Sequence, residues 1–196
     1  MKTVGLIGLG AMGGSYAKHL LASGYQVFGV DPDKNNRNLF SSLGGLIFDN
    51  IYDLTKKCRI VILSLPTVPI FKEVIEEIEN NKSLLETKII IDMNTISLED
   101  KLEAKDKLKK LKIELIDAPV SGTGAQAKLK DLVVMSSGLK SVVSECEDIF
   151  NSFARKHIYV GAFGNGIKFK ILANLLVTVH NTVTAEALLL GQKAGL

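Results

Sequence analysis

Two groups of residues have the types and the spacing that chemistry requires. Residues 8–13 read GLGAMG, the G-x-G-x-x-G pattern of a turn between a strand and a helix. The first glycine of such a turn permits a tight bend, the second lets phosphates approach the backbone, and the third lets the helix pack on its strand. Far along the chain, Lys170 and Asn174 stand four residues apart, which places them on one face of a helix. The first group predicts a pyrophosphate-binding turn, and the second predicts a site for proton transfer.

Asp31 supplies the next part of a nucleotide-binding fingerprint. It follows the apolar run at 27–30 and lies 18 residues beyond Gly13. A carboxylate at that position accepts hydrogen bonds from the adenosine ribose and repels a 2′-phosphate, so it favours NAD, with NADP as the alternative. Arg37 lies too far along the following helix to offset this charge. The competing interpretation is an ordinary strand–helix–strand unit with a chance glycine turn.

Lys170 is the candidate reactive group because it interrupts a segment that is otherwise built for burial. A buried amine loses solvation, which lowers its pKa and lets it exchange a proton near neutral pH. The alternative is a lysine that extends to water along an apolar surface. Thr178 and Asn181 continue the polar stripe of Lys170 and Asn174, whereas Lys168 points elsewhere and is expected to be a surface charge.

These groups need a sheet to bring them together. Strand-like runs alternate with helical periodicity, which is typical of an α/β fold of the Rossmann type, with a doubly wound, mostly parallel sheet. Strands are expected at 3–8, 26–30, 46–48, 59–64, 88–92, 114–117, 132–136 and 158–160. Helices are expected at 12–23, 34–43, 68–80, 98–111, 139–153 and 166–191, and Ser97 is expected to cap the fourth of them.

The loops at the carboxyl ends of the strands are the expected ligand-binding edge of such a sheet. Besides the glycine turn, these loops include 65–67, 93–95 and 117–124. The last one combines a proline, a hydroxyl and two glycines, so its backbone N–H groups could bind an anion such as a carboxylate. An ordinary Pro/Gly turn is the alternative for this loop.

The composition is that of a globular protein with one ordinary domain, or one domain plus an appendage. Hydrophobic residues make up 46% of the 196 and charged residues 23%, which is sufficient for a core. The net charge of +3 is too small to predict a nucleic-acid or membrane-surface partner. The densest basic group runs from Lys101 to Lys112, contains acidic side chains as well, and is expected to form a solvated helix face.

The cysteines and histidines do not indicate a metal site. Cys58 and Cys146 lack metal-ligand spacing, and small buried thiols in a reduced, cytoplasmic chain are the favoured interpretation. His157 and His180 have no acidic or cysteine companion at ligand spacing, and His19 falls late in a helix, where a cation is favourable. No metal is therefore expected.

The C-terminal segment is expected to be one long helix. Residues 166–191 contain no helix breaker between their terminal glycines. They can therefore form a helix of about 25 residues, which is roughly 40 Å long at ~1.5 Å per residue. The apolar side chains of this helix lie almost all round it, whereas a surface helix is apolar on one stripe only. Asn174, His180, Asn181 and Glu186 argue against lipid. The helix therefore predicts cover by a further domain or by a second subunit, and we favour a domain.

Three motifs in order make the chain resemble the β-hydroxyacid dehydrogenases. They are the glycine turn, the sequence DAPVSG at 117–122, and GNG at 164–166 followed by Lys170 and Asn174. The AEA at 185–187 and the KAG at 193–195 also resemble the helix that joins the two domains of this family. The family includes 3-hydroxyisobutyrate dehydrogenase, tartronate semialdehyde reductase and L-threonate dehydrogenase, and 6-phosphogluconate dehydrogenase is a more distant relative.

The resemblance implies an oxidoreductase that transfers a hydride between a small 3-hydroxy acid, 3-hydroxyisobutyrate-like or a sugar acid, and the nicotinamide of NAD. It makes Lys170 the general acid–base, with Asn174 and Ser121 completing the catalytic group. The implied substrate-binding residues are Ser121, Gly122, Thr123, Lys170 and Asn174. The implied cofactor-binding residues are Gly8, Leu9, Gly10, Ala11, Met12, Gly13, Asp31, Leu65, Pro66 and Thr95.

The resemblance also implies a domain organisation. Residues 1–163 are the expected NAD-binding domain, and 164–196 the start of an interdomain helix leading to an all-helical domain that this chain lacks. That helical region would complete the active site and build a homo-oligomer such as a dimer. Thr123 stands where the family has a second glycine, and Ala173 stands where relatives often have a polar residue. These two departures leave the identity of the substrate acid undetermined. The alternatives are an NADPH-preferring semialdehyde reductase and a non-catalytic dinucleotide-binding fragment.

Overall fold

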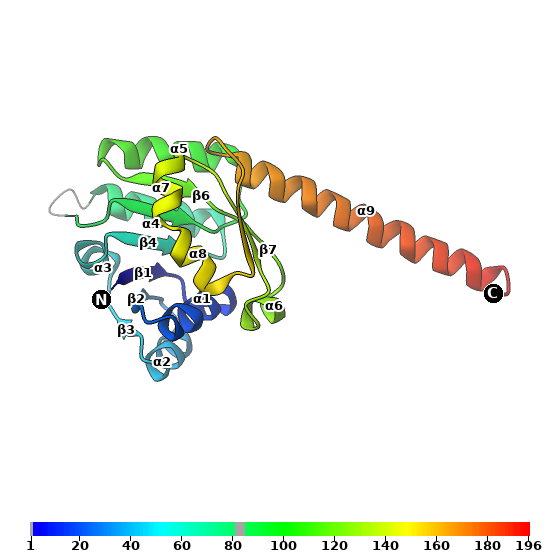
Figure 1. Cartoon of the computed structure of the whole chain (residues 1–196), viewed down its shortest axis with the longest axis horizontal. Helices are drawn as coiled ribbons and strands as arrows, with labels where there is room; N and C mark the ends of the chain where they lie inside the picture. Colours follow the sequence, from blue (N-terminus) through cyan, green and yellow to red (C-terminus); the bar gives the residue numbers. More distant parts are fainter. Residues whose placement is uncertain (1, 81–84) are drawn as a thin grey trace.

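A parallel sheet flanked by helices forms the body of the protein, and one long helix projects from it (Figure 1). The computed structural model describes residues 2–80 and 85–196. Within these residues, six strands pair in the order β3-β2-β1-β4-β5-β6, and every pair is parallel. Their bounds are β1 Thr3–Ile7, β2 Gln26–Val30, β3 Leu46–Ile47, β4 Ile60–Leu63, β5 Ile89–Asp92 and β6 Glu114–Asp117.

Helices connect these strands and cover both faces of the sheet. Their bounds are α1 Ala11–Ala22, α2 Lys34–Ser42, α3 Ile51–Lys57, α4 Val68–Asn80 and α5 Leu98–Lys110. The chain order reverses between β1 and β4, where a doubly wound sheet opens a crevice for ligands. The Rossmann-type fold predicted from the sequence is therefore confirmed.

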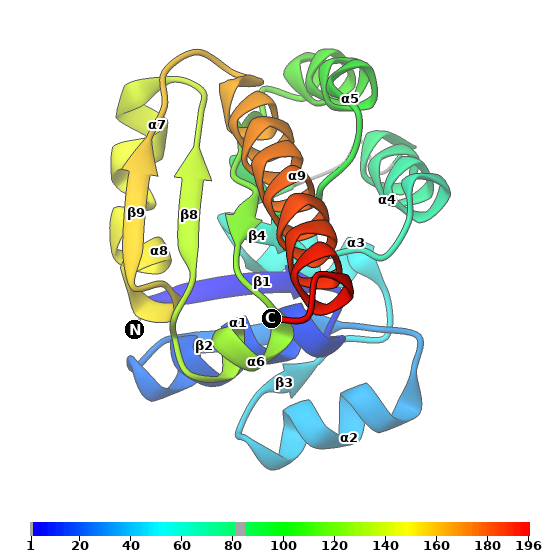
Figure 2. The same ribbon diagram turned by 90° about the vertical axis from the view of Figure 1, so that its right-hand side faces the viewer.

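The second half of the chain adds a smaller sheet. Its elements are β7 Val120–Ser121, α6 Gly124–Lys128, β8 Val133–Ser136, α7 Lys140–Glu145, α8 Glu147–Phe153, β9 Lys156–Tyr159 and α9 Asn165–Lys193. Strand β8 pairs antiparallel with β7 and parallel with β9. In Figure 2, β8 and β9 lie side by side, with α7 and α8 next to them.

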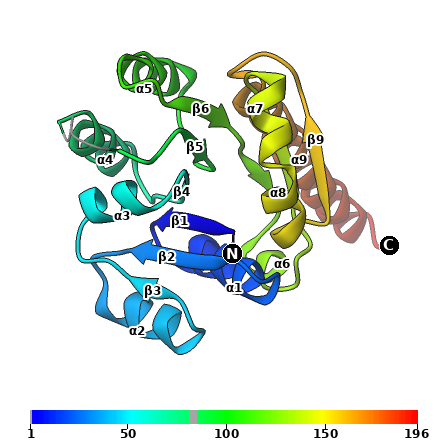
Figure 3. The same ribbon diagram turned by 60° about the vertical axis from the view of Figure 1, so that its left-hand side comes forward.

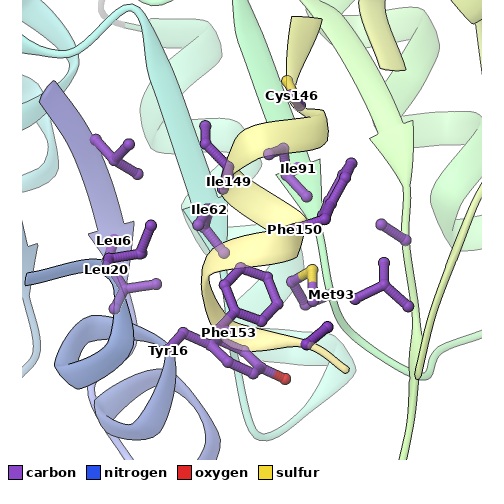
Figure 4. Close-up of a cluster of buried hydrophobic side chains, with 14 of the residues drawn as sticks. Leu6, Tyr16, Leu20, Ile62, Ile91, Met93, Cys146, Ile149, Phe150 and Phe153 are labelled. Carbon is purple, nitrogen blue, oxygen red and sulfur yellow. The ribbon is translucent and has the colours of Figure 1, made fainter. Parts of the chain in front are cut away.

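The core has two parts because successive strand residues face opposite sides of the sheet. On β4, for example, Ile62 joins the cluster under α1 and α8, whereas Val61 and Leu63 join the cluster under α3, α4 and α5. Figure 3 shows α3–α5 on one side of the sheet and α7 and α8 on the other. In the first cluster, the ring of Phe153 lies 4.7 Å from that of Tyr16, which attaches α8 to α1 (Figure 4).

Most elements fall where the sequence predicts them, and the differences have local causes. Strands β2 and β6 and helix α4 have the predicted bounds, and Ser97 caps α5 as expected. The single helix predicted at 139–153 is instead two helices that meet at Cys146. The sequence does not predict strand β7 or helices α3 and α6, because elements of two to seven residues are too short to show a period.

Helix α9 leaves the body of the protein after its first turn. It begins behind Gly164, which has a φ of 89°, and its buried residues are Gly166 and Ile167. Its exposed apolar side chains include Leu172, Leu176 and Leu188. Among the helices of the described residues, α9 alone has the length and hydropathy of a membrane span, with a mean hydropathy of 1.2 over 18 residues.

Candidate functional site

The glycine turn between β1 and α1 is built for close backbone approach. Gly8 has a φ of +92°, and a Cβ there would lie 2.1 Å from the carbonyl oxygen of Ser64. A Cβ on Gly13 would lie 2.0 Å from the carbonyl oxygen of Gly8, so the strand and helix pack only with a glycine here. A Cβ on Gly10 would meet nothing within 4 Å. Gly8 and Gly13 thus shape the turn, while Gly10 leaves open space above the backbone.

The N-terminus of α1 can hold an anion in that open space. Gly10 is the N-cap residue and offers no side chain, and the first turn of the helix contains no acidic residue. The first N–H groups of a helix have no acceptor within the helix, and the helix dipole adds partial positive charge there. The residues present therefore fit the pyrophosphate of a dinucleotide.

Asp31 lies beside this turn at the end of β2 and is held in a fixed orientation. Only 9% of Asp31 is exposed. Its Oδ2 accepts a hydrogen bond of 2.7 Å from the N–H of Leu9, and its Oδ1 accepts one of 2.8 Å from the N–H of Asp33. Asp31 and the glycine turn line one cleft of about 480 Å³, together with Leu65 and Pro66 from the loop after β4.

The charge of the cleft decides whether it suits an additional phosphate. Among the described residues that line it, none is a lysine or an arginine. Arg37, which follows on α2, directs its guanidinium to Asp49, with 2.6 Å between Nη2 and Oδ1. A carboxylate at the end of β2, without a neighbouring cation, suits ribose hydroxyl groups better than a 2′-phosphate.

A second pocket of about 250 Å³ adjoins the cleft. Both are lined by Met12, Ser64 and Leu65, so the two spaces share a wall. The other walls of the second pocket come from Thr95, after β5, and from Lys170, on α9, among others. Loops that are far apart in the sequence meet here because the carboxyl ends of parallel strands lie at one edge of the sheet.

Lys170 is half-buried in the second turn of α9 and faces the second pocket. Burial lowers the pKa of its ammonium below the ordinary value of 10.5. Lys168 is exposed, as its position on the helix predicts. Asn174 is exposed one turn farther along and does not line the pocket. The structure thus brings Lys170, but not Asn174, to the same pocket as Thr95.

The loop after β6 uses its residues in different ways. Ser121 is half-buried and pairs with Val133 of β8, and Gly122 lines the second pocket. Gly122 has a φ of +140°, and a Cβ there would lie 2.4 Å from a methyl of Leu132. Thr123 caps α6: its Oγ1 accepts a 3.3 Å hydrogen bond from the N–H of Gln126. The predicted substrate-binding roles of Ser121, Gly122 and Thr123 stay predictions.

A buried ion network is joined by hydrogen bonds to Asn94, which lines the second pocket. Lys101 of α5 is 0% exposed, and its Nζ lies 2.6 Å from Oδ2 of Asp92 and 3.0 Å from Oδ1 of Asp117. The prediction that this lysine belongs to a solvated helix face is wrong. Lys101 occupies the face of α5 that packs on the sheet, where the ends of β5 and β6 present the two carboxylates.

The opposite charges in this network offset the effect of burial on the pKa of Lys101 and of Asp92. Burial by itself would lower the pKa of Lys101, but the two flanking carboxylates raise it above its ordinary value, so the ammonium stays charged. Burial raises the pKa of Asp92, and the ammonium opposes that rise. The network is therefore two buried carboxylates held around one buried cation.

One end of the network reaches the cofactor cleft through Asn94. Oδ1 of Asp92 accepts hydrogen bonds from the backbone N–H of Asn94 at 3.0 Å and from its Nδ2 at 2.7 Å. The amide oxygen of Asn94 in turn accepts a 2.6 Å hydrogen bond from the N–H of Leu65. The loop after β4 is thereby held at the wall that the two pockets share.

The other end of the network holds the start of α9. Oδ2 of Asp117 accepts hydrogen bonds of 2.9 Å from the N–H of Ile167 and from Oγ of Ser137. That same Oγ accepts a 3.0 Å hydrogen bond from the N–H of Gly166. These bonds fix the first turn of the helix three residues before Lys170. A sequence signal existed, since aspartates end two successive strands and a lysine lies in the helix between them.

The histidines and cysteines have structural surroundings. Nε2 of His19 lies 2.9 Å from the carbonyl oxygen of Ala127, and Nε2 of His157 lies 2.6 Å from Oγ of Ser136. Burial raises the pKa of both Cys58 and Cys146 to about 12, which disfavours the reactive thiolate. In the part of the chain that the structure describes, no three His, Cys, Asp or Glu residues group as metal ligands.

The sheet order and the cleft define a dinucleotide-binding α/β domain, and comparisons with known proteins specify its family. The family model described as the NAD binding domain of 6-phosphogluconate dehydrogenase matches residues 3–161. Glyoxylate/succinic semialdehyde reductase 1 of Arabidopsis thaliana is 27% identical over 195 residues, covering 98% of this chain and 67% of that protein. The mitochondrial 3-hydroxyisobutyrate dehydrogenase of Homo sapiens is 30% identical over 199 residues, covering 98% of this chain and 58% of that protein.

A solved structure agrees with these sequence relatives. The 3-hydroxyisobutyrate dehydrogenase of Mycobacterium tuberculosis, solved with L-serine, superposes with a TM-score of 0.93 at 28% identity. The superposition covers 100% of this chain and 67% of that chain. The chain therefore belongs to the β-hydroxyacid dehydrogenase family and contains its NAD(P)-binding domain, as the motifs predicted. It spans 58% to 67% of the length of these relatives.

The glycine turn yields a paired prediction. Gly10→Ala leaves the unfolding midpoint nearly unchanged but lowers the affinity for NADH about tenfold or more, equivalent to ~1.4 kcal/mol, because its methyl enters the space for the phosphates. Gly13→Ala instead destabilises the protein, because its methyl overlaps the carbonyl of Gly8. Thermal unfolding and calorimetric titration with NADH measure the two effects. Unchanged NADH affinity in Gly10→Ala contradicts the assignment of the turn.

The ion network yields a stability prediction. Lys101→Met lowers the free energy of unfolding by about 3–5 kcal/mol, because it leaves two buried carboxylates without a cation. This loss of stability becomes smaller as the pH falls. The unpaired buried carboxylates of the folded variant are protonated at a pH at which the same groups in the unfolded chain are still ionised, so a lower pH favours the folded variant. Urea unfolding at several pH values measures it.

The exposed Lys109 on the same helix provides the matched control for that experiment. Lys109→Met changes the free energy of unfolding by no more than about 0.5 kcal/mol, as is usual for surface substitutions. Equal losses in the two methionine variants would show that the buried network does not stabilise the fold.

Proposed function

We propose that this chain forms the cofactor-binding and catalytic part of an NAD-dependent 3-hydroxyacid dehydrogenase, with Lys170 as the general acid–base. The observation that carries this proposal is the position of Lys170. Its half-buried ammonium, with a lowered pKa, lines a pocket that shares Met12, Ser64 and Leu65 with the dinucleotide cleft. The hydride leaves the carbinol carbon of the substrate and the proton leaves the oxygen bonded to that carbon, so a proton-exchanging group belongs at the junction of the two spaces.

The residues that would hold the dinucleotide follow the order of the cleft. Asp31 would bind the adenosine ribose, and the N–H groups at 10–13 would bind the pyrophosphate. Met12, Leu65, Pro66 and Thr95 would line the nicotinamide end, toward the second pocket. A bound dinucleotide supplies the nicotinamide that takes up or releases the hydride.

The chain's own residues would move the proton and orient the acid. In oxidation, neutral Lys170 would accept the proton of the substrate hydroxyl, and in reduction its ammonium would return that proton. Ser121 and the backbone at Gly122 would hold the substrate carboxylate. This contact would orient the carbinol of the substrate toward Lys170 and the nicotinamide. Asn174, one helical turn from Lys170, would contact the same substrate.

We propose a small hydroxy acid as the substrate. Two relatives support this class by name: one is a dehydrogenase of 3-hydroxyisobutyrate, the other a reductase of glyoxylate and succinic semialdehyde. The volume of the second pocket, about 250 Å³, suits a molecule of that size. The second relative keeps open a semialdehyde reductase as the alternative activity.

We also propose that α9 is an interdomain helix that is covered by protein, with the boundary between 163 and 164. Its apolar side chains lie on all sides, and the solved dehydrogenase covers the whole of this chain, α9 included. Association of the helical region into a homo-oligomer, such as a dimer, and a cytoplasmic location complete the proposal.

The cofactor preference can be tested directly. The protein is expected to bind NADH at least about tenfold more tightly than NADPH, a difference of ~1.4 kcal/mol, because a 2′-phosphate would face Asp31 without a cation. Asp31→Asn removes the negative charge and is expected to reduce the difference between the affinities for NADH and NADPH. Fluorescence titration with both cofactors measures the two affinities, and tighter binding of NADPH by the unmodified protein refutes the preference.

The role of Lys170 predicts a selective kinetic defect. Lys170→Ala lowers kcat by about 10²–10⁴-fold, the usual contribution of a general acid–base, while NADH affinity stays unchanged. In the unmodified protein, the oxidation rate rises with pH as the amine becomes neutral. Because burial lowers the pKa of Lys170, that rise is centred below 10.5. Steady-state rates of hydroxy acid oxidation between pH 6 and 11 measure both effects.

Lys168→Ala is the control for that experiment, since this neighbouring lysine is exposed. It is expected to leave kcat and its pH profile unchanged. The proposed mechanism fails if Lys170→Ala retains a rate near that of the unmodified protein, or if its pH profile keeps the same midpoint. A protein that binds NADH and oxidises none of the hydroxy acids would instead be a non-catalytic dinucleotide-binding module.

A further inference from the structure

Tyr16 is the one large aromatic side chain that belongs to both the core and the second pocket, among the residues that the structure describes. It lies on α1, one helical turn after Met12, and is 1% exposed. Its ring packs against Phe153, with 4.7 Å between the ring centroids. Figure 4 shows the ring beside Phe153 and its oxygen directed toward the edge of the labelled apolar cluster.

Within residues 2–80 and 85–196, the hydroxyl group of Tyr16 makes no hydrogen bond. This hydroxyl is also not among the fully buried side-chain atoms without a partner, so it reaches the open space beside the core. A tyrosine whose ring is buried usually directs its hydroxyl to a hydrogen-bond partner, and here that partner has to come from the adjoining open space. Burial raises the pKa of Tyr16 above its ordinary value, so the group keeps its proton and can donate it in a hydrogen bond.

The second pocket is where a partner for this hydroxyl can bind. Tyr16 and Lys170 both line it, from α1 and α9 respectively. The amide of Asn94, another polar group of this pocket, is already bound to Asp92 and to the N–H of Leu65. Tyr16 therefore offers a donor that the folded chain itself does not use.

We propose that Tyr16 is a specificity-determining residue whose hydroxyl donates a hydrogen bond to a second oxygen substituent of the hydroxy acid that Lys170 acts on. This inference rests on the proposed function. It predicts a preference for acids that carry a hydroxyl next to the reacting carbinol over acids that carry a methyl there. A site built to bind a hydroxyl rejects the analogue that lacks it, because its own polar group is then left unsatisfied.

Glycerate and 3-hydroxyisobutyrate form the matched pair of substrates for this inference. Both are three-carbon-chain acids with a hydroxyl on C3, and they differ in a hydroxyl or a methyl on C2. The unmodified protein is expected to show the higher kcat/KM with glycerate. Tyr16→Phe lowers kcat/KM for glycerate about tenfold, the usual effect of one lost hydrogen bond, and leaves that for 3-hydroxyisobutyrate within about twofold.

Tyr25→Phe is the matched control variant. It removes the same hydroxyl from a buried tyrosine that lines a different pocket, next to Lys2 and Asp148. Its ratio of kcat/KM values for the two acids should equal that of the unmodified protein. Tyr16→Phe should also keep the unmodified thermal unfolding midpoint, because no hydrogen bond within the protein is lost.

Calorimetric titration of each acid into the NADH-saturated protein provides a readout that does not depend on turnover. Tyr16→Phe should weaken the binding of glycerate about tenfold and leave the binding of 3-hydroxyisobutyrate unchanged. Equal effects on both acids, or no effect on either, overturn the role of Tyr16 while the proposed function stands. If the unmodified protein neither binds nor oxidises any hydroxy acid, the proposed function fails and this inference fails with it.

Discussion

The buried ion network of Asp92, Lys101 and Asp117 is the constraint on which the rest of the site depends. One ammonium lies 2.6 Å and 3.0 Å from two carboxylates, and all three side chains are 0% exposed. Charges removed from water are tolerated only when partners are close and the remaining lone pairs are satisfied. The remaining bonds go to Asn94 and to the first turn of α9, so satisfying the charges also fixes both walls of the second pocket.

This constraint explains how a helix that projects from the body can carry a positioned lysine. Beyond its first turn α9 has little contact with the rest of the described chain, and its apolar side chains are exposed. Its N-terminal N–H groups are nevertheless bound to Asp117 and Ser137, which are fully buried. Lys170 follows these bonds by a single turn, close enough to share a pocket with the loop that Asn94 holds.

The sequence predicts the parts of this arrangement that depend on local pattern. The glycine turn, Asp31 and the parallel strands follow from spacing and from the period of apolar residues. The burial of Lys101 does not, because its partners come from strand ends nine residues before it and sixteen residues after it. The position of Tyr16 at the second pocket does not follow from the sequence either. Helical spacing places Tyr16 in the core, but the pocket beside it forms only when Phe153 and α9 pack in the folded protein.

A structure of the protein in complex with NADH and a hydroxy acid would show whether the dinucleotide cleft and the pocket of Lys170 form one redox site. We expect the acid in the second pocket, with Nζ of Lys170 within about 3 Å of its C3 oxygen and with C3 facing the nicotinamide. An acid bound outside that pocket, or Lys170 turned away to solvent in the complex, would contradict it.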